Sequence, residues 1–284
     1  MTLLFAAGLR IAASAIARAG LGAALLLFAA PALAHEFWIE PKDFRVEPGA
    51  AIRADLKTGQ KFKGDVFPYL RDRFVSYRLT GRSGGGDVAR YDGASPSLDV
   101  RAAQPGLNIV TYHSRPDRLI YRDWDKFTAY AEYEGLDQAV AEHRRRGLPE
   151  TDFSETYIRC AKALIQAGPV TAQDRDRAIG MPLELVAQAN PYAEEQSGAF
   201  AVRLLWRGEP LGGVQVAIFQ DRGGGNVRRS VVRTGKDGIA FVPLDGGGRF
   251  LLNAVQLLPA DPNSGDEWES HWASLTFAVA AGRE

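Results

Sequence analysis

Short segments that alternate apolar and polar side chains, separated by glycine and proline turns, recur along most of this 284-residue chain. They occupy residues 44–46, 51–56, 74–79, 97–101 and 107–113, and then 183–187, 200–206, 214–219, 227–233, 239–242, 250–256 and 272–279. Alternation with a period of two is typical of strands that bury one face, and strands at this spacing favour antiparallel sandwiches. We therefore predict a mainly β protein with two antiparallel β-sandwich domains, at 35–116 and 183–284.

A different periodicity follows Pro116, where apolar residues recur every three or four positions. This spacing predicts helices over three ranges, 123–134, 136–146 and 153–167. Asp152 and Glu155 resemble a capping box at the start of the third helix, and Gly168 with Pro169 would end it. We expect a helical insert at 117–168, joined to the second sandwich by a linker at 169–182.

The first 34 residues have the composition of a secretory signal peptide. Arg10 and Arg18 precede an apolar run that ends in Ala32-Leu33-Ala34, a small-x-small cleavage pattern. A retained membrane anchor is the alternative, but the uncharged run from 19 to 34 is shorter than the ~20 residues that span a bilayer. We predict a signal peptide at 1–34 and a periplasmic mature protein.

Cleavage after Ala34 would make His35 the first residue of the mature chain. A terminal histidine offers its α-amine and its imidazole Nδ1 to one ion, and imidazole suits copper, nickel and zinc. The alternative is that the peptidase simply cuts before whatever residue follows. We expect the apolar residues Phe37, Trp38 and Ile39 to dock this start of the chain as a strand.

Composition and motifs argue against several classes of protein. The formal net charge of +0 and the pI of about 6.9 do not suit a nucleic-acid binder. The single cysteine, Cys160, excludes a multi-cysteine metal site, and we interpret it as a packed core thiol. No glycine-rich nucleotide motif, G-x-S-x-G elbow or H-E-x-x-H motif occurs, so we predict no enzyme activity, with a hydrolase a distant third choice.

The other histidines are His113, His143 and His271. His143 precedes three arginines on a predicted helix, and we expect it to be solvated. His113 ends a strand of the first sandwich and His271 begins a strand of the second. Either one would complete a metal site with His35 only if these strand ends converge; the alternative is that each is an ordinary packed or exposed histidine.

A set of motifs resembles one family across nearly the whole mature chain. The motifs are HEFWIEP, YHSRP, EGL, ETYIRCAKALI, GMPLELVAQANPY, GEPLGGVQV, GKDGIAFVPL and WESHWASLTF. Together they are similar to the domain-of-unknown-function family 4198, whose members are exported bacterial proteins often labelled as cobalt or nickel uptake components. The resemblance implies two immunoglobulin or prealbumin-like sandwiches with a helical insert. The family's starting histidine maps onto His35, and a further family histidine falls where this chain has Gln256.

Two functions follow as hypotheses. The first is a periplasmic transition-metal-binding protein for uptake or delivery of nickel, cobalt or copper, with His35, His113 and His271 as ligands. Glu36 or Glu40 would then orient an imidazole, and a membrane transporter would be the partner. The alternative is a non-catalytic adaptor without a metal, which presents sandwich loops, with exposed Trp268 and Trp272, to an outer-membrane receptor. Neither hypothesis involves nucleic acid or a nucleotide.

Overall fold

The computed structural model describes residues 36–101, 103–193 and 198–280. Strands dominate this part of the chain, which confirms the prediction of a mainly β protein. The predicted signal peptide at 1–34, and His35 after it, lie outside the described residues. None of the described helices is long and apolar enough to cross a membrane.

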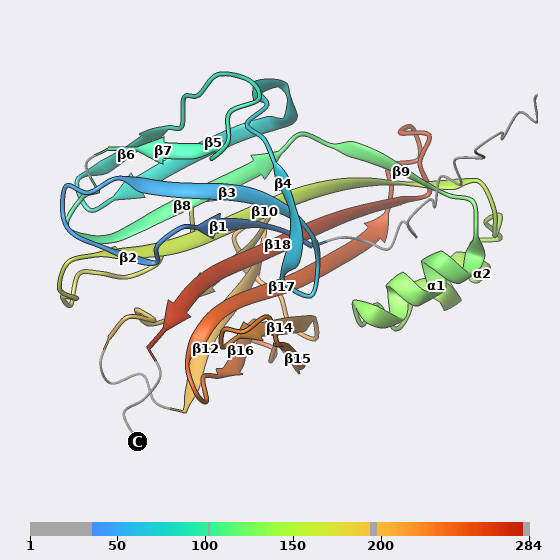
Figure 1. The fold of residues 1–284 in the computed structure, drawn as a ribbon. Coiled ribbons are helices and arrows are strands. Elements are labelled where there is room, and N and C mark those ends of the chain that lie inside the picture. Colours follow the sequence, from blue (N-terminus) through green and yellow to red (C-terminus); the bar gives the residue numbers. More distant parts are fainter. Residues whose placement is uncertain (1–35, 102, 194–197, 281–284) are drawn as a thin grey trace, which may run out of the picture. The chain divides into compact units, whose positions relative to one another are not determined.

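The largest sheet has ten strands within the described residues, in the order β15-β14-β17-β18-β10-β8-β5-β6, with β2 and β9 also paired to β10. The strands are β2 (Arg45–Val46), β5 (Phe74–Gly81), β6 (Gly84–Asp87), β8 (Gly106–Ser114), β9 (Asp117–Tyr121), β10 (Phe153–Ala167), β14 (Gln215–Asp221), β15 (Val227–Arg233), β17 (Gly248–Pro259) and β18 (Trp268–Val279). β10 and β18 run parallel and lie side by side (Figure 1), so this sheet joins strands of both predicted sandwiches.

Two smaller sheets accompany it among the described residues. One has the order β1-β3-β4, with β7 also paired to β3, and the other has the order β11-β12-β13, with β16 also paired to β12. Their strands are β1 (Glu36–Pro41), β3 (Ile52–Gln60), β4 (Lys63–Phe67), β7 (Leu98–Val100), β11 (Leu183–Ala187), β12 (Ala199–Trp206), β13 (Glu209–Pro210) and β16 (Ile239–Pro243). The predicted docking of the apolar start as a strand, β1, is confirmed.

Each smaller sheet covers one face of the large sheet. Ile39 of β1 packs with Val110 of β8 and Ala163 of β10 in one hydrophobic core. Leu185 of β11 packs with Leu164 of β10 in the other core. Because neighbouring residues of a strand point to opposite faces, Ala163 and Leu164 place the two cores on opposite sides of β10. The two layered cores of the predicted sandwiches therefore share a central sheet.

The third predicted helix, at 153–167, is wrong: this segment is the 15-residue strand β10. From Cys160 to Ala167 every residue is buried, because both faces of the strand are covered. A strand buried on both sides reads as a continuous apolar run rather than an alternation, and periodicity cannot separate it from a helix. The predicted capping box is also absent, since Glu155 lies within the strand.

The other two predicted helices are confirmed, with shorter bounds. α1 is Trp124–Tyr133, and the carboxylate of Asp123 accepts a hydrogen bond from the backbone N–H of Asp125 at its start. α2 is Ala139–Arg145. A single 3-10 turn at Arg71–Arg73 precedes β5. The helical insert is thus confined to the segment between β9 and β10.

The predicted linker at 169–182 carries neither helix nor strand, yet it is tied to the large sheet. Asp176 and Glu184 both form ion pairs with Lys162 of β10, at 3.2 and 2.6 Å. All three side chains are at most 1% exposed. This buried ion network anchors the chain where it passes from β10 to β11.

Candidate functional site

Three polar side chains from distant parts of the sequence meet on the face of the large sheet that carries β1. Glu36 is the first residue of β1, Glu134 caps the C-terminal end of α1, and Asn253 lies in the middle of β17. They are 0%, 3% and 1% exposed, respectively. We call these three residues the acidic cluster.

Hydrogen bonds satisfy only part of the acidic cluster. The hydroxyl of Tyr133 donates to Glu36 Oε1 at 3.4 Å, and Asn253 Nδ2 donates to Glu134 Oε2 at 3.2 Å. Three buried oxygens, Glu36 Oε2, Glu134 Oε1 and Asn253 Oδ1, have no hydrogen-bond partner among the described residues. Unpaired buried acceptors are rare and costly, so this concentration of them marks a place where a further group would be stabilising.

Burial sets the charge state of the two carboxyls. It raises the pKa of Glu36 to about 7 and the pKa of Glu134 to about 8. The negative charge of Glu36 raises the pKa of Glu134 further, which shows that the two groups are close enough to interact. Both carboxyls are therefore partly protonated near neutral pH, and a cation placed between them would favour their ionised forms.

One positive side chain faces this pair. The charge of Arg229 lowers the pKa of both carboxyls. Its guanidinium lies 4.1 Å from the centre of the Tyr133 ring, and its NH2 donates to the Tyr133 carbonyl at 2.7 Å. The Arg229 Nε is buried without a partner in the described residues. When both carboxyls are ionised, Arg229 supplies one positive charge against two negative charges.

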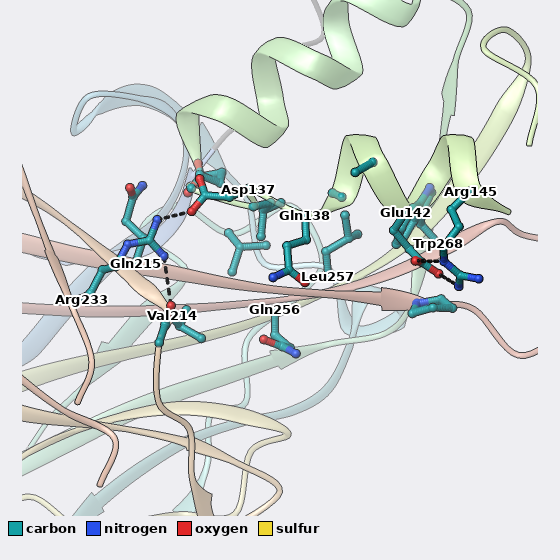
Figure 2. Close-up of a pocket in the computed structure, with 18 residues that line it drawn as sticks. Asp137, Gln138, Glu142, Arg145, Val214, Gln215, Arg233, Gln256, Leu257 and Trp268 are labelled. Atoms are coloured by element: carbon teal, nitrogen blue, oxygen red, sulfur yellow. Dashed lines mark hydrogen bonds and ion pairs between the residues drawn. The ribbon is translucent and has the colours of Figure 1, made fainter. Parts of the chain in front are cut away.

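A groove of about 620 Å³ leads to Glu134. Figure 2 shows Gln138 and Glu142 of the helical segment on one side, and Leu257 and Trp268 of β17 and β18 on the other. The next residue, Gly135, has a φ of +68°, and a Cβ there would lie 2.6 Å from Gln215 Oε1. Glycine therefore allows the chain to end α1 with a left-handed turn that lies close to β14. This turn positions Glu134 in the lining of the groove.

The donor set of the acidic cluster suits a divalent cation. Carboxylate and amide oxygens are ligands for hard and borderline divalent ions. Within the described ranges, however, no three His, Cys, Asp or Glu side chains converge in a way that could hold a metal ion. A complete site would need donors beyond these two carboxylates. His35, which the sequence predicted as the first ligand, is covalently bonded to Glu36 but lies outside the described residues.

The other two predicted ligands lie on the opposite face of the large sheet from β1. His271 packs at 4.6 Å, between ring centres, against Trp206 of β12, and β12 belongs to the other small sheet. Its Nε2 lies 2.7 Å from Glu269 Oε1, and its Nδ1 is buried without a partner in the described residues. Burial lowers the pKa of His113, and the charge of His271 lowers it further. These two histidines are neighbours of each other, whereas the acidic cluster lies on the other side of the sheet.

Three further predictions about side chains can be compared with the structure. His143 is fully buried rather than solvated: its Nδ1 accepts from Trp268 Nε1 at 3.0 Å, inside an aromatic cluster under the helices. Trp268 and Trp272, predicted to be exposed, are only 2% and 6% exposed. Cys160 is a buried thiol as predicted, and burial raises its pKa to about 12.

Sequence reasoning did not single out Glu134 or Asn253 as functional residues. Glu134 stands in the EGL motif, and Asn253 lies three residues before Gln256, at the strand where the family pattern has a histidine. The segments were thus recognised, but not the role of these side chains. No local pattern joins residues 36, 134 and 253, because only the packing of β1, α1 and β17 brings them together.

The fold and the acidic cluster define a mainly β protein with a buried acidic site beside a groove. Over residues 32–257 the chain matches the family described as "Domain of unknown function (DUF4198)", and the protein belongs to this family. No curated protein matches the chain. Among solved structures it is similar to the "D0-D1 domain of Intimin", at 12% identity, with 84% of this chain and 96% of that chain covered and a TM-score of 0.20.

Proposed function

We propose that this chain is a periplasmic protein that binds a transition-metal ion, nickel, cobalt or copper, at the acidic cluster and the mature amino terminus. The observation that carries the proposal is the group of three buried, unpartnered oxygens on Glu36, Glu134 and Asn253. Of these residues, Glu36 lies next in the chain to His35, which signal-peptide cleavage would leave as the terminus. The protein would serve uptake or delivery of the ion through a membrane transporter, without enzyme activity.

In this proposal the protein supplies two kinds of donor. Glu36 and Glu134 provide carboxylate oxygens, and Asn253 provides an amide oxygen. His35, one peptide bond away from Glu36, provides its α-amine and imidazole Nδ1 once Ala34 is removed, and nitrogen ligands favour later transition metals over calcium or magnesium. The ion would supply the positive charge that Arg229 alone does not.

His113 and His271 are not part of this ligand set. β1 lies on one face of the large sheet, and His271 packs against β12 on the other face. The metal-binding hypothesis is therefore retained with His35, and its partner ligands are changed from histidines to the acidic cluster. The adaptor hypothesis loses its main support because Trp268 and Trp272 are buried and cannot form an exposed aromatic contact surface.

The proposal predicts that metal affinity depends on both parts of the site. Titration calorimetry with Ni²⁺, Co²⁺ and Cu²⁺ on the processed protein should show one site per chain. Glu134→Gln, and separately one extra alanine before His35, should each weaken the affinity at least tenfold, about 1.4 kcal/mol. Each change removes a charged or chelating donor while the fold is retained.

Glu155→Gln is the matched control, because Glu155 is also a buried carboxyl with a raised pKa, but both of its oxygens accept hydrogen bonds from Tyr121 and Ser270. Its metal affinity should equal that of the unmodified protein. Weak binding that is the same for the unmodified protein, the extended form and Glu134→Gln would refute the proposed site.

A further inference from the structure

A second, smaller pocket of about 220 Å³ lies where β1, β8 and β10 meet. Aromatic rings and guanidinium groups line it together: Phe37, Tyr112, Tyr157, Arg73, Arg115 and Arg159. Successive residues of a strand point to opposite sides, so Phe37 faces this pocket while Glu36 faces the acidic cluster. The two sites therefore do not share a side chain.

Arg159 is the unusual residue of this pocket. Its backbone N–H donates to Ser114 Oγ at 2.9 Å, which fixes the start of the side chain. Its guanidinium lies 5.3 Å from the Phe37 ring centre and 4.8 Å from the Tyr157 ring centre. Within the described residues no ion pair joins the Arg159 guanidinium to a carboxylate. Desolvation lowers the pKa of Arg159, so a negatively charged partner would stabilise it. An arginine remains charged in proteins, so this half-buried guanidinium carries a positive charge that no carboxylate pairs with among the described residues.

Asp117, one of the two carboxylates that line the pocket, already has other partners. Asp117 Oδ2 pairs with Arg73 NH1 at 3.3 Å and accepts a hydrogen bond from the Tyr157 hydroxyl at 3.1 Å. It influences Arg159 through its charge without forming an ion pair. Arg115, which also lines the pocket, is exposed. Asp72 is the other carboxylate of the lining, so three arginines face two carboxylates and the pocket carries one unbalanced positive charge.

We propose that this pocket binds a small organic carboxylate, with the Arg159 guanidinium as its anchor. The planar fork of five N–H donors matches a carboxylate in a bidentate arrangement. Phe67 and Tyr157, which line the pocket and are partly exposed, provide aromatic surface for an apolar body. The volume equals that of about seven water molecules, which suits a ligand the size of benzoate.

The aromatic lining favours an organic carboxylate over inorganic phosphate. Phosphate has no apolar part, so the rings of Phe67 and Tyr157 would strip its hydration shell without replacing the lost hydrogen bonds. A carboxylate on a ring places its charge at Arg159 and its apolar surface on the walls. The inference is independent of the proposed metal site, which lies on the other side of β1.

The test is titration of the full mature chain with sodium benzoate, sodium acetate and sodium phosphate. Calorimetry and the shift in melting temperature measure the binding. Benzoate is expected to bind one site with a Kd of about 1 mM or tighter, and acetate and phosphate more weakly. Arg159→Lys keeps the charge but removes the fork, and should weaken benzoate binding at least tenfold. Arg53→Lys is the matched control, because Arg53 pairs with Asp99 away from the pocket, and its affinity should not change.

If Arg159→Lys does not fold, Arg115→Gln replaces it, because Arg115 is exposed and its substitution should leave the fold intact. Arg115→Gln removes a positive charge near the pocket and should therefore lower the affinity for benzoate severalfold. Three results would overturn the inference: no saturable benzoate binding to the unmodified protein, benzoate binding that Arg159→Lys and Arg115→Gln leave unchanged, or tighter binding of phosphate than of benzoate. The first of these would leave the metal titration unaffected, so the two proposals fail separately.

Discussion

Replacing Lys162 by methionine is expected to lower the free energy of unfolding by about 3–5 kcal/mol. Lys162 is the only cation paired with Asp176 and Glu184 in the described part of the chain, and all three side chains are buried. Methionine has a similar length and leaves no large cavity. The cost therefore comes from two carboxylates left without their positive partner, rather than from lost packing.

The backbone around the ion network explains why the carboxylates cannot simply turn away. Glu184 accepts hydrogen bonds from the backbone N–H groups of Ile179, Gly180 and Met181 at 2.8–3.2 Å. Asp176 accepts from the N–H of Ala187 at 2.9 Å. These bonds hold both acids in place, so loss of the lysine leaves their charges buried instead of solvated.

Denaturant unfolding of the Lys162→Met protein measures this effect, with Lys63→Met as the control because Lys63 is exposed. Adding Glu184→Gln to Lys162→Met should recover part of the loss, since one of the two unpaired charges is then removed. A loss below about 1 kcal/mol in Lys162→Met would contradict the view that this network anchors the segment between β10 and β11.

The second large effect concerns pH. Burial raises the pKa of Glu155 to about 7 from an ordinary value of 4.5. Between pH 4.5 and pH 7, Glu155 is therefore protonated in the folded protein and ionised in the unfolded chain. The contribution of Glu155 to stability is complete below pH 4.5 and is lost as the pH rises through 7. The difference amounts to about 3 kcal/mol at pH 8.

Glu155→Gln should remove this dependence, because the amide resembles the protonated acid and keeps the bonds with Tyr121 and Ser270. We expect the variant to match the unmodified protein near pH 4.5 and to exceed it at pH 8, where the Tm should rise by roughly 2–4 °C for each kcal/mol. Thermal unfolding across this range measures the difference. Glu132→Gln, on the exposed surface of α1, is the control, and parallel curves for all three proteins would refute the prediction.

Sequence patterns alone were sufficient to predict elements that have one buried and one exposed face. β16, for example, has one buried and one more exposed face, and the alternation appears directly in its residues. α1 begins directly after Asp123, whose side chain caps it, and such a residue marks a helix start in any tertiary context. Family membership also follows from the sequence, because the order of motifs does not depend on how they pack.

The tertiary structure decided what the patterns could not express. β10 is a strand rather than a helix because sheets cover both of its faces, and burial on both sides removes the alternation that would identify it. His143 is buried because its ring packs against Phe153 and Trp268, which lie farther along the chain, and Trp268 donates to it.

The sequence indicated some residues of the candidate site, and only the tertiary structure identified the others. The sequence indicated His35 and Glu36 through the cleavage pattern, whereas Glu134 and Asn253 came close to Glu36 only when α1 and β17 packed beside β1. The sequence placed His113 and His271 with His35, but side-chain direction relative to the large sheet puts them across it from β1. Residue type and spacing are local properties, while the face of a sheet on which a side chain lies depends on which strands become neighbours.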